Sequence, residues 1–201
     1  ARWVPRCLGL VLQAVAALLT LGAARPALSV LPLANSGFLQ PMLVALPMVF
    51  TAWIMRKPLE NSGSSWAKGY AQVEVGLRQV WFLGGFAFAC LSIVLEALRS
   101  IPDARQGELP VFSSHMQVYA IMLAVLGAMV LADWFGKRKD WSVAGWPGKF
   151  SLPFLSVCLF GAVIDGRHIL YIPDLILWVA ALCMHIWLLR RQPVSRWTHA
   201  M

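Results

Sequence analysis

Six long apolar runs constrain the fold of this chain more than any other feature of its sequence. A helix needs about 20 mostly apolar residues to cross the hydrocarbon core of a membrane. Runs of this kind cover residues 7–24, 38–55, 79–98, 116–135, 150–164 and 168–189. We therefore expect an all-α polytopic membrane protein with about six transmembrane helices in one bundle, and a single transmembrane domain over residues 1–201.

The balance of apolar and charged residues supports lipid as the solvent of this chain. Hydrophobic types make up 59% of the 201 residues and charged types 13%, whereas a soluble domain carries about 25% charged residues. The net charge of +8 could suit nucleic acid, but the basic residues stand at the ends of the apolar runs, where they suit lipid headgroups and membrane topology better. We expect no nucleic-acid partner.

Two segments allow more than one interpretation. Residues 1–24 place Arg2 and Arg6 before an apolar run, a pattern that also occurs in signal peptides. We expect a membrane span here, because the charge pattern described next requires it. The fifth and sixth runs are separated only by the turn sequence Asp165-Gly166-Arg167. They could form a re-entrant hairpin, but two separate spans agree better with the charges.

Basic residues fall mainly on one side of a six-span arrangement. That side would hold both termini and the second and fourth connections, and it would carry 13 of the 17 Lys and Arg residues. The other four are Arg25, Arg99, Arg105 and Arg167. Because short cytoplasmic or matrix-facing loops retain Lys and Arg, we expect both termini on the same, positive side.

Few patterns for metal or cofactor chemistry occur. The cysteines Cys7, Cys90, Cys158 and Cys183 stand far apart in apolar runs, so neither a zinc site nor a dithiol site is indicated. Of the four histidines only His185 lies well inside a run, which does not fit a pair of haem ligands. Walker, nucleophile and Rossmann motifs are missing. We expect no metal, and bound phospholipid as the one non-protein component.

One polar pair occurs within the last apolar run. Asp174 and His185 are 11 residues apart, so a helix would place them on one face. We expect them to form an intramembrane polar pair. Such a pair could relay protons, or it could fix helix packing through hydrogen bonds, and the sequence leaves both interpretations open.

The second and fourth connections are the most basic parts of the chain. Anionic lipid phosphates are attracted to clusters of Lys and Arg beside a membrane span. We expect lipid headgroups to bind at Arg56, Lys57, Lys68, Arg78, Arg138 and Lys149. The alternative is ordinary retention of positive charge on one side, without a specific lipid site.

Several short motifs occur in an order that resembles a known enzyme family. Val4-Pro5 opens the first run and Thr51-Ala52-Trp53 ends the second. The fourth connection contains Gly136-Lys137-Arg138, Ser142-Val143-Ala144 and Trp146-Pro147-Gly148-Lys149. In this order they are similar to motifs of the CDP-alcohol phosphotransferases, which include phosphatidylglycerophosphate synthases and cardiolipin synthases. The resemblance implies a six-helix membrane fold and covers most of the chain outside residues 99–112.

The resemblance fails at the residues that carry the family's chemistry. The family signature D-x-x-D-G-x-x-A-R, followed by G-x-x-x-D-x-x-x-D, supplies four aspartates that bind divalent metal and activate the attacking hydroxyl. The corresponding residues here are Ala52, Met55, Val73 and Leu77. Because metal-assisted phosphoryl transfer needs such oxygen ligands, the resemblance implies a relative without this activity.

We therefore predict a non-catalytic accessory or scaffold subunit of a multi-subunit membrane complex, with bound anionic lipid such as cardiolipin. The resemblance favours a respiratory-chain complex of the mitochondrial inner membrane, with a bacterial inner membrane as the alternative. Two other functions stay open. One is an active membrane enzyme of phospholipid metabolism that uses Glu60, Glu74 or Asp133. The other is a small transporter or proton-relay protein built on Asp174 and His185.

Overall fold

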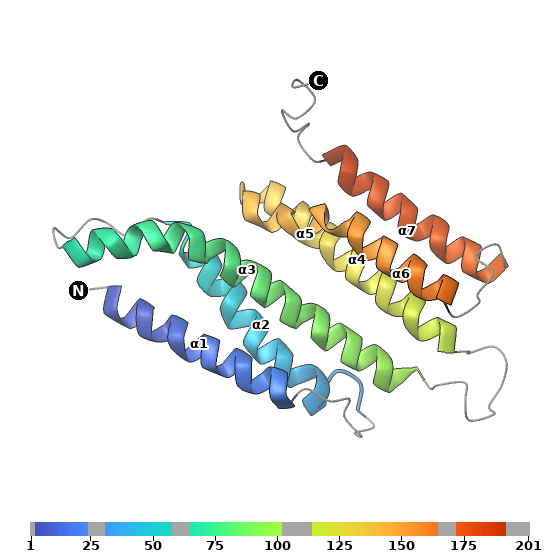
Figure 1. Cartoon of the computed structure of the whole chain (residues 1–201), viewed down its shortest axis with the longest axis horizontal. Coiled ribbons are helices and arrows are strands. Elements are labelled where there is room, and N and C mark those ends of the chain that lie inside the picture. Colours follow the sequence, from blue (N-terminus) through green and yellow to red (C-terminus); the bar gives the residue numbers. More distant parts are fainter. Residues whose placement is uncertain (1–2, 24–30, 58–64, 102–113, 165–171, 192–201) are drawn as a thin grey trace. The chain divides into compact units, whose positions relative to one another are not determined.

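The computed structural model describes residues 3–23, 31–57, 65–101, 114–164 and 172–191. These residues form α-helices and one short 3-10 helix, with no strand among them, which confirms the all-α class. The chain divides into two compact helical units, Ala1–Ser100 and Ile101–Met201. Figure 1 shows the helices of each unit. The single transmembrane domain expected from the sequence stays a prediction.

Five described helical stretches are long and apolar enough to cross a membrane. They are Val4–Ala23, Ser36–Ile54, Gly69–Ser100, Gln117–Arg138 and Ser142–Val163. Each of them overlaps one of the first five predicted runs. The chain is therefore an all-helical integral membrane protein, as its composition indicates.

The first unit contains α1 (Trp3–Ala23), α2 (Ser36–Ile54) and α3 (Ser65–Ser100). Helix α2 begins where Asn35 caps it, because the Asn35 side-chain oxygen accepts a hydrogen bond of 3.0 Å from the backbone N–H of Phe38. Pro41 and Pro47 lie inside α2. Proline is tolerated in membrane helices because neighbouring helices and local adjustments satisfy the freed backbone groups.

Helix α3 begins earlier than the sequence predicts, at Ser65 rather than at Gln79. Part of the expected second loop is therefore helical, and Arg78 lies within a helix. The early turns lack proline and carry Glu74, whose charge is compensated by Arg6 on α1. The 36 residues of α3 rise about 54 Å, well beyond a hydrocarbon core of about 30 Å. Figure 1 shows the first part of α3 running at an angle to the rest.

Helices α2 and α3 approach each other closely at two adjacent glycines. A Cβ atom on Gly85 would lie 2.8 Å from Val49 Cγ2 and 2.9 Å from the carbonyl oxygen of Ala45. A Cβ atom on Gly84 would lie 2.7 Å from Met48 Cε. Small residues allow membrane helices to pack backbone against backbone. The packing of the first unit therefore requires Gly85, whereas at Gly84 the flexible end of Met48 can move aside.

The second unit contains α4 (Ser114–Arg138), the 3-10 helix η2 (Ser142–Gly145), α5 (Trp146–Lys149), α6 (Ser151–Ile164) and α7 (Ile172–Arg191). A tight turn follows α4, in which the N–H of Trp141 donates to the carbonyl oxygen of Gly136 over 2.7 Å. A Cβ on Gly136 would lie 2.8 Å from the Trp141 carbonyl oxygen, so the turn requires glycine there. Asp140 adopts a left-handed φ of 51°, which Asp tolerates better than most residues.

The last two predicted runs have different outcomes. Helix α6 has only 14 residues, and it reaches spanning length together with η2 and α5 in the stretch Ser142–Val163. Helix α7 has 20 residues, with Asp174 in its first turn and Arg190 and Arg191 in its last, and it is not among the five stretches. The sixth span and the placement of both termini on one side therefore stay predictions. The turn at residues 165–167 lies outside the described residues.

Candidate functional site

The four positions that correspond to the family's aspartates do not share one environment. Ala52 and Met55 are buried, at 0% and 6% exposure, whereas Val73 is 58% exposed and Leu77 is half-buried. Within the described ranges, no three His, Cys, Asp or Glu side chains are placed to hold one metal ion. These positions supply apolar contacts and surface, and their side chains offer no oxygen ligand.

Glu74 is the acidic residue closest in sequence to these positions within the described residues. Its side chain is 5% exposed, and its Oε1 lies 2.6 Å from Nη1 of Arg6 on α1. A buried carboxylate is stable only with such a partner, and this ion pair joins α1 to α3. Glu60, the other acid considered for an active enzyme in this region, lies outside the described residues.

A second polar contact joins all three helices of the first unit. Gln13 on α1 donates to Thr51 Oγ1 on α2 over 2.8 Å. The same side chain accepts a hydrogen bond of 2.6 Å from Trp81 Nε1 on α3. Side-chain hydrogen bonds of this kind hold membrane helices together. The side chains of Gln13, Thr51 and Trp81 are therefore used in helix packing.

The lipid-binding residues predicted in the first unit have different environments. Arg56 follows α2 and places its guanidinium carbon 3.8 Å from the ring centre of Trp53. Lys57 is exposed beside it. Arg78 is half-buried on α3, and its Nε is buried without a hydrogen-bond partner among the described residues. The side chain of Lys68 lies outside the described residues.

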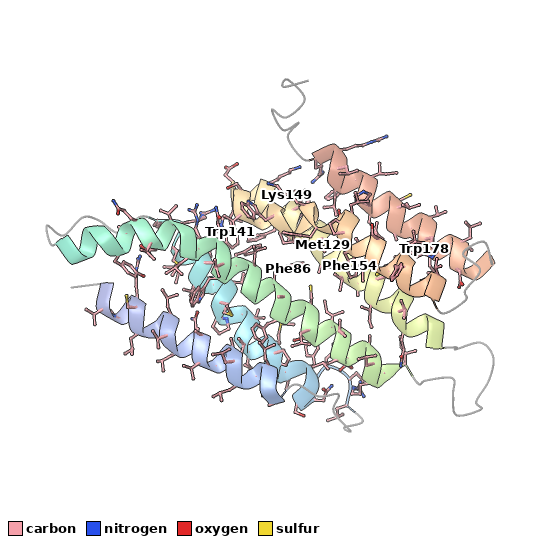
Figure 2. All side chains as sticks on the ribbon, in the orientation of Figure 1. Phe86, Met129, Trp141, Lys149, Phe154 and Trp178 are labelled. Atoms are coloured by element: carbon pink, nitrogen blue, oxygen red, sulfur yellow. The ribbon has the colours of Figure 1, made fainter. Side chains whose placement is uncertain are left out.

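A pocket of about 490 Å³ lies in the second unit, where the end of α4 meets η2, α5 and the last turn of α7. Its charged lining consists of Lys137, Lys149, Arg191, Asp133 and Asp140, which gives a formal charge of +1. Trp141, Trp146, Ser142, Gly136 and Gly145 complete it. Figure 2 shows Trp141 and Lys149 at one end of this unit and Trp178 towards the other. The pocket is thus a cationic recess at the end of a helical bundle.

Lys137 holds two sides of the pocket together. Its ammonium nitrogen lies 3.4 Å from Asp133 Oδ2 on α4 and donates to the carbonyl oxygen of Arg191 at the end of α7. Asp133 is 5% exposed, and its Oδ2 makes no hydrogen bond to the described residues, although it lies at ion-pair distance from Lys137. A buried carboxylate oxygen of this kind still has capacity to accept a hydrogen bond.

Tryptophan and a basic residue recur together at the ends of four helices. The pairs are Trp53 with Arg56, Trp134 with Arg138, Trp146 with Lys149 and Trp187 with Arg191, at 3.8, 5.2, 5.0 and 3.9 Å from cation to ring centre. All four stand at or just after the carboxyl ends of α2, α4, α5 and α7. Cations over indole faces are attracted to them, and both residue types favour the membrane–water interface.

The predicted residues Arg138 and Lys149 therefore have different positions. Lys149 lines the pocket. Arg138 is exposed and stands over Trp134 outside the pocket lining. Lipid binding at either residue stays a prediction.

The polar residues of α7 do not meet each other. Eleven residues of helix separate Asp174 from His185, a rise of about 16 Å, so the two side chains cannot hydrogen bond directly. His185 is buried, and its Nδ1 lies 2.8 Å from Oγ of Ser151 on α6. Ser151 Oγ in turn donates to the carbonyl oxygen of Gly148 over 2.6 Å, which leaves the hydroxyl oxygen as acceptor for the imidazole N–H. This chain of bonds fastens α7 to α5 and α6.

Lys137, Arg191 and Ser151 are among the residues of this region that were not predicted from the sequence as site residues. Lys137 and Arg191 complete the pocket, and Ser151 is the partner of His185. Lys137 and Arg191 end helices that meet only in the folded unit. The sequence signal that identifies Lys137 and Arg191 is a tryptophan three or four residues before a basic residue at a helix end.

Comparison with protein families, characterised proteins and solved structures finds no match to this chain. The fold and the site therefore define its class by themselves. It is an all-helical integral membrane protein with a cationic, tryptophan-bordered pocket at the end of its second unit.

Proposed function

We propose that this protein is a non-catalytic accessory subunit of a larger membrane complex and that it binds anionic phospholipid at its basic helix ends. The observation that carries the proposal is the pocket of about 490 Å³ lined by Lys137, Lys149 and Arg191. Clusters of basic residues beside membrane helices attract anionic headgroups. The tryptophans in and around the pocket support a position at headgroup level.

Support for a non-catalytic role comes from the first unit. Apolar residues occupy the four positions where the resembled family carries its metal-binding aspartates. The carboxylate of Glu74 is committed to the ion pair with Arg6. The alternative of an active phospholipid-metabolising enzyme would be favoured by metal-dependent release of CMP from CDP-diacylglycerol, which we expect to be absent.

Support for an accessory subunit comes from the exposed apolar helix faces. The spanning stretch of α1 is only 11% buried within the chain, so its apolar side chains need lipid or neighbouring subunits as partners. We propose a mitochondrial inner-membrane complex of the respiratory chain, or a bacterial inner-membrane complex, on the basis of the family resemblance. Six spans with both termini on the positive side complete the proposal.

The lipid part of the proposal is tested by native mass spectrometry of protein taken from nanodiscs. We expect retention of cardiolipin or phosphatidylglycerol over phosphatidylcholine. Arg191→Glu should lower retention of anionic lipid at least about fivefold, since one basic residue near a membrane surface is worth about 1 kcal/mol. Arg190→Glu is the matched control, because Arg190 does not line the pocket. Equal losses of lipid retention in both variants would show that retention depends on general surface charge and not on the pocket.

The subunit part of the proposal is tested by extraction in mild detergent and native gel electrophoresis. We expect the protein to migrate with a larger membrane assembly. Migration as the isolated chain under every mild condition would contradict an accessory role.

A further inference from the structure

We propose that Asp133 selects phospholipids whose headgroup carries a free hydroxyl, so that the pocket takes a glycerol-type phosphodiester rather than any anionic lipid. This inference rests on the proposed lipid binding. It specifies which part of the lipid enters the pocket, namely the headgroup. It starts from a buried carboxylate oxygen, Oδ2 of Asp133, that makes no hydrogen bond to the described residues.

The buried position of Asp133 points to a hydrogen-bond donor from a ligand. Its side chain is 7% exposed and lines the pocket. Its Oδ2 makes no hydrogen bond to the described residues, and the nearby Lys137 ammonium stands at 3.4 Å while it donates to the Arg191 carbonyl. A buried acceptor without a hydrogen bond costs free energy, and a donor brought by the ligand would remove that cost.

The charges of the pocket fix the orientation of such a ligand. A phosphate group is repelled by the Asp133 carboxylate and attracted to the exposed cations Lys149 and Arg191. The phosphate therefore lies towards those two residues, and the headgroup reaches inward to Asp133. A phosphodiester with one negative charge balances the pocket's formal charge of +1.

A hydroxyl fits the inner position better than an ammonium group. An ammonium beside Asp133 Oδ2 would stand close to the Lys137 ammonium, which already lies 3.4 Å from that oxygen. Like charges at such distances repel each other, whereas a hydroxyl donates a hydrogen bond without adding charge. Gly145 also lines the pocket, and a Cβ there would lie 3.3 Å from Asp133 Oδ1, so the absence of a side chain keeps this region open.

The test compares two anionic lipids of matched headgroup length, one with free hydroxyls on the headgroup and one without. Phosphatidylglycerol and phosphatidylpropanol carry the same single negative charge and a three-carbon headgroup, but phosphatidylpropanol has no headgroup hydroxyl. Binding to the full chain is measured by native mass spectrometry with both lipids present in one nanodisc, beside phosphatidylcholine and phosphatidylethanolamine. We expect a preference for phosphatidylglycerol of about tenfold, the effect of a hydrogen bond to a charged group.

Two matched variants separate hydrogen bonding from charge. Asp133→Asn should reduce the preference to about threefold or less, because hydrogen bonds to neutral acceptors are about half as strong. Asp140→Asn makes the same change on an exposed residue of the pocket, where asparagine also tolerates the left-handed φ of 51°. It should strengthen binding of both anionic lipids and leave their ratio near that of the unaltered protein.

Each contrary outcome has a distinct meaning. Equal binding of the two anionic lipids, both above phosphatidylcholine, would overturn selection by Asp133 and leave the proposed anionic-lipid function intact. Binding of neither above phosphatidylcholine would overturn the proposed function itself. Preference for phosphatidylethanolamine would show that the pocket takes an ammonium group in place of the hydroxyl. Displacement of phosphatidylglycerol by an equal concentration of deacylated glycerophosphoglycerol would show that the ligand is a soluble phosphodiester. Either result overturns the inference.

Discussion

Arg6 and Glu74 form an ion pair of 2.6 Å that connects the first helix to the early turns of the third. The Glu74 side chain is 5% exposed and the Arg6 side chain 29% exposed. Removing one member of a buried pair leaves the other charge without compensation, which costs more than the pair contributes. The pair therefore controls how well α1 is held in the first unit.

We predict that Glu74→Leu lowers the free energy of unfolding by about 2 kcal/mol, less than for a fully buried pair because Arg6 reaches solvent in part. The measurement is unfolding in mixed micelles, followed by tryptophan fluorescence. The exchanged pair, Arg6→Glu with Glu74→Arg, should recover part of the loss. An unchanged stability of Glu74→Leu would show that this ion pair contributes nothing to the packing of α1.

The glycines of α3 provide a test of close helix packing. Gly85→Ala should destabilise the first unit by about 1–3 kcal/mol, because the added Cβ meets Val49 Cγ2 at 2.8 Å and the Ala45 carbonyl oxygen at 2.9 Å. Gly76→Ala is the control on the same helix, since a Cβ there has no atom within 4 Å. It should stabilise the helix slightly, since alanine is the better helix former. Both are measured in the same micelle assay, and a neutral Gly85→Ala would contradict the packing described.

The bond between Ser151 and His185 gives a third prediction. Ser151→Ala should cost about 1–3 kcal/mol, because it leaves the buried His185 Nδ1 without its partner. In the double variant with His185→Leu, most of the cost of Ser151→Ala should disappear, because no imidazole Nδ1 is then left without its partner. A double-mutant cycle measures the coupling. Coupling near zero would mean that the two side chains do not depend on each other.

The number of spans gives a fourth prediction. A reporter enzyme that is active on only one side of the membrane is fused after residue 164 or after residue 191. With six spans, the two fusions report opposite sides, and the fusion after residue 191 agrees with one at the N-terminus. Equal reports from both fusions would show that α7 does not cross the membrane.

The sequence predicts the helical class and the centres of the membrane helices well, because apolar runs of spanning length have few other folds available. It misplaces the start of α3 by 14 residues. Because these turns contain the polar residues Lys68, Glu74 and Arg78, the sequence predicts a loop there. Glu74 and Arg6 are 68 positions apart in the sequence, so no local sequence pattern predicts their ion pair.

The candidate site could be predicted only in part for the same reason. Lys149 was expected at a lipid site from local charge alone. The partners that give the pocket its form, Lys137 and Arg191, come from helix ends that are distant in sequence. His185 was expected to pair with Asp174 on its own helix, whereas its bond goes to Ser151 on α6. Periodicity reports which residues share a face, and it does not report which neighbouring helix that face meets.

The three tryptophan–cation pairs of the second unit have a consequence for membranes of different thickness. Trp134, Trp146 and Trp187 stand with their basic partners at helix ends, and such residues fix the depth of a helix at one interface. A thinner or thicker bilayer then changes the fit at the opposite ends of α4 and α6, which belong to described spanning stretches. Helix α6, with 14 residues beyond α5, has the least length to spare there, so hydrophobic mismatch in a thick, sterol-rich membrane would act first on α6.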